Sequence, residues 1–116
     1  MDFDLVIKGG NVIDGTGSDA VLKDVAVSDG RILQVGDVSD SAIGSKTEII
    51  EAHDRVVSPG FVDIHTHYDA QIMWDRSLSC SPWHGVTTAV IGNCGFGVAP
   101  MRPEHRDTIM ATLEKV

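Results

Sequence analysis

Two histidines separated by one residue, His65 and His67, are the residues best suited to chemistry. Side chains at positions i and i+2 of a β-strand point to the same face, so both imidazoles can reach one metal ion from a strand end. Neutral imidazole is a ligand for zinc and related divalent metals. The alternative is a pair of ordinary polar residues at a strand end. The spacing alone leaves both interpretations open.

The two cysteines, Cys80 and Cys94, are too few for a disulfide scaffold, and their separation matches no CxxC motif. We expect both to be thiols, free or metal-bound. Cys80 lies in a connection rich in serine, where nothing nearby has the spacing of a second metal site. The remaining histidines are expected at the surface or in local hydrogen bonds rather than on a metal: His53, His84 and His105.

Length and composition restrict the possible classes of protein. The chain has 116 residues, and its 42% hydrophobic and 22% charged residues are ordinary for a globular protein, so disorder and coiled coil are excluded. The net charge of -8 would repel nucleic acid and anionic lipid, so neither is expected as a partner. The sequence shows no secretory signal and no apolar run of about 20 residues, which predicts a cytoplasmic protein.

The first half of the chain reads as a small antiparallel sheet. Its short, β-branched runs, separated by glycine, predict these strands: residues 5–7, 12–13, 25–27, 32–35, 48–50 and 55–57. Residues 8–11 are expected to form a turn, and residues 39–46 a loop. Asp29 and Gly30 favour a type I′ hairpin, because both central positions of that turn need positive φ.

After residue 60 the pattern changes to that of an α/β protein. Residues 61–65 predict a short strand, and residues 85–92 form a β-branched run typical of strands buried on both faces of a parallel sheet. The segment between them is long enough for a crossover. Residues 104–115 have apolar positions at helical spacing, with Pro103 suited to the first turn. The order of strand, crossover, strand and helix is the opening of an α/β repeat.

Three motifs then follow one another in a specific order. The sequence PGFVDIHTH at residues 59–67 resembles the first barrel strand of the amidohydrolase superfamily. Residues 11–17 and 25–32 are similar to the small β-sandwich that precedes the barrel in these enzymes. The sequences HGVTT at 84–88 and IGNCGFGVAP at 91–100 resemble one branch in particular, the D-aminoacylases and other N-acyl-D-amino-acid deacylases.

The resemblance implies a zinc-dependent hydrolase with one or two metal ions, held in this chain by His65, His67 and Cys94. A metal-bound thiol is deprotonated, and its charge partly neutralises the metal. In the family the metal activates water for attack on the amide of an N-acyl-D-amino acid, which releases a carboxylate and a D-amino acid. Tyr68 and Asp69 are expected in the first βα loop, where barrel enzymes bind substrate, or else as a packed ring and a helix cap.

The implied fold class is mixed β and α/β. Residues 1–57 would form an incomplete β-sandwich segment, and residues 58–116 the first two strand units of an incomplete TIM-type barrel. A complete barrel takes about 250 residues, and the family's two later histidines and its general acid/base aspartate would lie beyond residue 116. We therefore expect an N-terminal fragment of a longer deacylase, inactive alone and able to self-associate through an exposed barrel edge.

Two other hypotheses stay open. One is a different amidohydrolase, a cyclic amide hydrolase or a deacetylase, although Cys94 speaks against it because those branches place their bridging ligand elsewhere. The other is a stand-alone β-rich module that binds metal or acts as a scaffold without catalysis. The preferred D-amino acid and acyl group would depend on later barrel loops.

Overall fold

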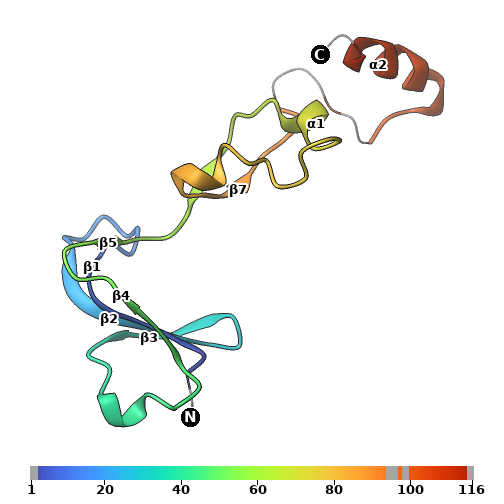
Figure 1. The fold of residues 1–116 in the computed structure, drawn as a ribbon. Helices are drawn as coiled ribbons and strands as arrows, with labels where there is room; N and C mark the ends of the chain where they lie inside the picture. Colours follow the sequence, from blue (N-terminus) through green and yellow to red (C-terminus); the bar gives the residue numbers. More distant parts are fainter. Residues whose placement is uncertain (1–2, 94–96, 98–99, 115–116) are drawn as a thin grey trace. The chain divides into compact units, whose positions relative to one another are not determined.

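A computed structural model describes residues 3–93, 97 and 100–114, which divide into two compact units, Met1–Pro59 and Gly60–Val116 (Figure 1). The strands are β1 (Leu5–Val12), β2 (Val21–Ser28), β3 (Arg31–Gly36), β4 (Glu48–Glu51), β5 (Val56–Val57), β6 (Phe61–Asp63) and β7 (Val86–Ala89). The helices are α1 (Tyr68–Gln71) and α2 (Arg106–Leu113), with short 3₁₀ helices η1 (Asp40–Ala42), η2 (Pro82–His84) and η3 (Pro103–His105). No helix in the described residues is long and apolar enough to cross a membrane.

The first unit contains a mixed sheet in the order β3-β2-β1-β4, with β5 also paired to β1. The pairs β1–β2 and β2–β3 are antiparallel, but β4 and β5 run parallel to β1. The expectation of a purely antiparallel sheet is therefore wrong. The segment between β3 and β4, which includes η1, returns the chain across the sheet, so that β4 runs in the same direction as β3 but lies beside β1.

The predicted turn at residues 8–11 is also wrong, because the backbone there continues as one strand. The register of β1 against β2 shifts between Ile7 and Gly10, which is a β-bulge. Gly9 adopts φ +67°, and its amide donates a 2.8 Å hydrogen bond to the Asp24 carboxylate. The glycines thus permit a kink within the strand, and Asp24 holds it in place.

The predicted hairpin at Asp29 and Gly30 is confirmed. These residues have φ of 51° and 69°, and the flanking residues Ser28 and Arg31 are paired across β2 and β3. Positive φ at both central positions is the signature of a type I′ turn. Packed inside this unit, Val6, Ala26 and Val38 form a small core, with Phe3 and Ile43 against it.

The second unit is organised around the parallel pair β6–β7. The connection between these strands contains α1 and η2, so the predicted crossover between parallel strands is confirmed. The predicted helix at 104–115 is present as η3 followed by α2. The run at 85–92 is a strand only from Val86 to Ala89. The prediction that this strand is buried on both faces is wrong, because Thr87 and Thr88 are exposed. Among the described residues, the two-stranded sheet is not covered on both faces by other elements.

Candidate functional site

The two histidines of the HxH motif lie together just beyond the end of β6. Their ring centroids are 5.8 Å apart with an interplanar angle of 33°, and both side chains are exposed. Two imidazoles that bind one tetrahedral ion through bonds of about 2.0–2.1 Å hold their centroids roughly 5 Å apart. The observed separation therefore fits a shared divalent metal after a small adjustment of the side chains.

The segment that carries the histidines is not part of the strand ladder. Strand β6 ends at Asp63, whose carboxylate accepts a 3.1 Å hydrogen bond from the amide of His65. Such a bond from an aspartate to the amide two residues later offers the backbone an alternative to the ladder. The side-chain amide of Asn93 donates to the carbonyl of Ile64, which links this segment to the chain after β7.

Thr66, between the two exposed histidines, differs from them in its burial. Its side chain is buried, and its hydroxyl donates a 2.7 Å hydrogen bond to the carbonyl of Val90. No role was predicted for Thr66 from the sequence. Its place between two residues expected on one face was the signal that could have indicated a different environment for Thr66.

Tyr68 and Asp69, the predicted substrate contacts, begin helix α1. The hydroxyl of Tyr68 hydrogen-bonds to the hydroxyl of Ser81. Asp69 is buried, and its carboxylate accepts a 3.2 Å hydrogen bond from the amide of Gly92. Asp69 does not occupy the N-cap position, which belongs to His67. The prediction that the two residues contact substrate stays a prediction.

The third predicted ligand, Cys94, lies outside the described residues. Within residues 3–93, 97 and 100–114, no three His, Cys, Asp or Glu side chains are grouped closely enough to hold a metal ion. Cys80 is an exposed free thiol. The described part of the chain therefore supplies two candidate ligands, His65 and His67, and the role of Cys94 stays a prediction.

Asp75 organises the connection between α1 and η2, a role that sequence reasoning missed. Its carboxylate accepts hydrogen bonds from the amide and hydroxyl of Ser79, from the side chain of Gln71 and from the amide of Ser77. The bonds from Ser79, above all, lower the pKa of Asp75 from 3.8 to about 2. The serines two and four residues after Asp75 were the available signal.

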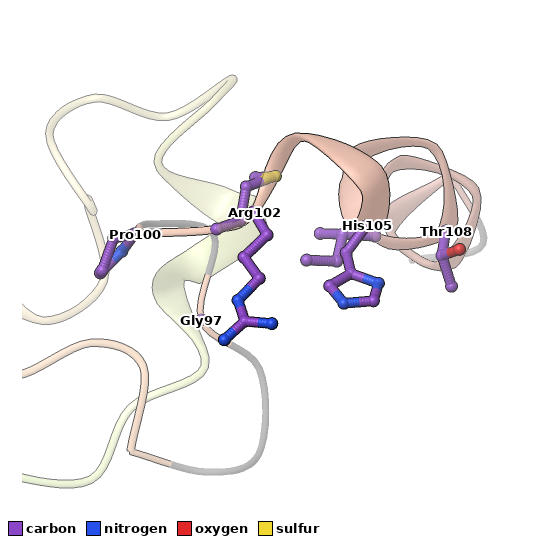
Figure 2. Close-up of a pocket in the computed structure, with 7 residues that line it drawn as sticks. Gly97, Pro100, Arg102, His105 and Thr108 are labelled. Carbon is purple, nitrogen blue, oxygen red and sulfur yellow. The ribbon is translucent and has the colours of Figure 1, made fainter.

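A separate cavity of about 460 Å³ lies beside η3 and α2. Figure 2 shows that the side chains of Arg102 and His105 extend to the same side of η3, and that Thr108 lies nearby on α2. Neither histidine of the HxH motif lines the cavity.

Comparison with known proteins places the chain in a family. The model of the amidohydrolase family matches residues 48–112, which include the HxH segment, β6 and β7. The chain belongs to the amidohydrolase family. The predicted resemblance to the D-aminoacylase branch is also confirmed: D-aminoacylase of Alcaligenes xylosoxydans xylosoxydans is 39% identical over 99 residues, which are 85% of this chain and 20% of that protein.

Solved structures agree with this assignment. A D-aminoacylase structure, described as having a binuclear metal center, matches with a TM-score of 0.76 and 41% identity over 92% of this chain and 23% of that one. The N-acyl-D-glutamate deacylase of Bordetella bronchiseptica, solved with zinc and a phosphonate inhibitor, matches with a TM-score of 0.74 and 36% identity over 86% of this chain and 20% of that one. This amidohydrolase chain thus spans about a fifth of the length of these relatives.

Proposed function

We propose that the protein is a zinc-dependent hydrolase that cleaves the linear amide of N-acyl-D-amino acids into a carboxylate and a D-amino acid. The observation that supports this most is the His65–His67 pair, whose centroid separation of 5.8 Å suits a shared ion, in a chain similar to deacylases of these substrates. A divalent metal supplies the Lewis acidity that amide hydrolysis requires.

Cys94 completes the proposed ligand set. It follows Gly92 and Asn93 directly in the sequence, and the side chain of Asn93 bonds to the backbone of the His segment at Ile64. A cysteine ligand binds as the thiolate, whose negative charge offsets part of the metal charge. Imidazole binds a metal ion in its neutral form, so in this ligand set the Cys94 thiolate would supply the one negative charge.

Tyr68 is the proposed substrate contact in the first βα loop. It is half-buried, its hydroxyl bonds to Ser81, and it directly follows His67. A phenol in this place can donate to an oxygen of the substrate and supply an apolar ring beside the acyl group. Asp69 was predicted together with Tyr68 as a substrate contact, and its burial favours a role in holding the backbone instead.

The proposed architecture is a β-sandwich segment over residues 1–57 followed by the first two strand units of a metal-dependent barrel over residues 58–116. The parallel pairing of β6 and β7 across a connection with α1 supports the barrel part. We propose that the general acid/base aspartate and two further histidines lie beyond residue 116, so that the 116-residue chain is inactive alone. Self-association through the strand edges and a cytoplasmic location are further parts of this proposal.

The test of the metal site is zinc stoichiometry in matched variants. His67→Ala and Cys94→Ala should each lower the zinc bound per chain, measured by metal analysis after dialysis against a defined free-zinc concentration. Cys80→Ala is the control, because its thiol is exposed and lies in a connection, and should bind zinc like the wild type. Equal zinc in all four proteins would contradict the ligand assignment.

The test of the reaction is the intact mass of the protein isolated from its source cells, followed by assay of that form. A mass well above 12.4 kDa and hydrolysis of N-acyl-D-amino acids, but not of their L-enantiomers, are expected. A native form of 12.4 kDa that binds zinc without hydrolysis would favour the non-catalytic module instead.

A further inference from the structure

Two buried polar side chains join the His segment to the chain that follows β7. Thr66 is 4% exposed and Asp69 is 6% exposed. Thr66 donates to the carbonyl of Val90 at 2.7 Å, and Asp69 accepts from the amide of Gly92 at 3.2 Å. We name these two hydrogen bonds, between Thr66 and Val90 and between Asp69 and Gly92, the clasp.

The clasp begins where the backbone ladder stops. Strand β6 ends at Asp63 and β7 at Ala89, and the amide of Val90 donates a further backbone bond to the carbonyl of Asp63 at 2.8 Å. Past this point, the bonds that connect the His segment to residues 90–93 within the described part of the chain come from side chains. The exposed Asn93 adds one such bond, and the two clasp bonds come from buried groups.

Burial makes the clasp bonds consequential. A buried hydroxyl or carboxylate that loses its partner costs free energy, so the native backbone position that satisfies both groups is favoured over its neighbours. Because Thr66 lies between His65 and His67, any shift that breaks its bond to Val90 also moves both imidazoles. A metal site needs its ligands held within about 0.5 Å.

We propose that Thr66 and Asp69 are positioning residues, which hold the His65–His67 pair in a fixed place against the C-terminal end of β7. This inference rests on the proposed metal site and gives the two residues a role through the histidines, without contact to metal or substrate. Groups that orient metal ligands in this way commonly affect metal affinity about 10–100-fold when they are removed.

The test compares substitutions that remove a clasp bond with substitutions that keep it, in the 116-residue chain. Thr66→Val removes the hydroxyl at nearly constant shape, and Thr66→Ser keeps it. Asp69→Ala removes the acceptor, and Asp69→Asn keeps an oxygen. The zinc dissociation constant from chelator competition should rise roughly 10–100-fold for Thr66→Val and Asp69→Ala and stay near the wild-type value for Thr66→Ser.

Amide hydrogen exchange provides the second measurement and does not depend on zinc. In the apo protein, protection of the Gly92 amide should fall in Asp69→Ala and persist in Asp69→Asn. The control is Asp75→Ala, which removes another carboxylate that accepts hydrogen bonds from backbone amides. It should lower the exchange protection of the Ser79 amide and leave the protection of the Gly92 amide and the zinc dissociation constant unchanged. Amides of the first unit, such as Val6, report whether each variant keeps its fold.

The results separate the clasp from the metal site itself. Zinc binding by the wild type with an unchanged constant in Thr66→Val and Asp69→Ala would overturn the clasp and leave the proposed ligands standing. A zinc dissociation constant raised in Thr66→Ser as much as in Thr66→Val would also overturn the positioning role. If the wild-type chain binds no zinc, the proposed metal site fails, and the positioning role fails with it.

Discussion

Gly60 lies against the side chain of Thr87 so closely that a Cβ built on Gly60 would overlap it. Gly60 directly precedes β6 and Thr87 lies in β7, next to the bond from the amide of Phe61 to the carbonyl of Gly85 at 2.9 Å. The position of the Thr87 side chain against Gly60 therefore requires a residue without a side chain at position 60. This explains physically why a glycine follows Pro59 in the motif.

Gly60→Ala should weaken the pairing of β6 and β7. Overpacking of this kind costs about 1–3 kcal/mol, because the Thr87 side chain or the strand that carries it must move to admit the methyl group. Hydrogen exchange of the Phe61 amide should accelerate accordingly, while amides of the first unit keep their rates. Gly36→Ala is the control, because a Cβ there meets only Gln34 at an ordinary 3.8 Å. Equal effects of the two substitutions would contradict the steric explanation.

Val6→Ala should destabilise the first unit by about 2 kcal/mol, since Val6 is fully buried in the small core with Ala26 and Val38. The matched control is Val56→Ala in the same sheet, where the side chain is 63% exposed and the expected change is within about 0.5 kcal/mol. Urea denaturation followed through exchange of β1 and β2 amides measures both. A similar loss of unfolding free energy in the two variants would contradict the assignment of Val6 to the core of this unit.

Acid should loosen the connection around Asp75. Because the folded pKa, about 2, lies below the ordinary 3.8, the ionised carboxylate stabilises the connection above about pH 4. This contribution is lost as the pH falls from about 4 to about 2. Protection of the Ser79 amide should follow that course in the wild type. In Asp75→Asn it should be lower at neutral pH and show no such step; a step in this variant would assign the titration to another group.

Zinc should stabilise the second unit and leave the first unchanged. A ligand at 100 times its dissociation constant adds about 2.7 kcal/mol to the state that binds it. Addition of zinc should therefore slow exchange of the Val90 amide, which bonds to Asp63 near the histidines, and a chelator should reverse the effect. His67→Ala should abolish the response. Slower exchange of the Val6 amide, in the first unit, would instead indicate a metal site that does not involve the His pair.

Local chemistry made several features readable from the sequence. The Asp29–Gly30 hairpin, the helix after Pro103 and the crossover between parallel strands depend on turn preference, helical spacing and segment length, which neighbouring residues encode. The HxH spacing likewise indicated that the two imidazoles lie together, although the predicted strand at 61–65 ends at Asp63 and the histidines follow it. The family assignment followed from the order of the three motifs.

Contacts between distant residues decided the rest. The parallel placement of β4 beside β1 and the bulge at Gly9, held by Asp24, replaced an expected antiparallel sheet and an expected turn, because these outcomes depend on partners 15 or more residues away. The burial of Thr66 and Asp69 has the same origin: their partners, Val90 and Gly92, follow 24 and 23 residues later. The sequence by itself determined which residues could bind a metal, and only the tertiary structure decided which buried polar groups hold those residues in place.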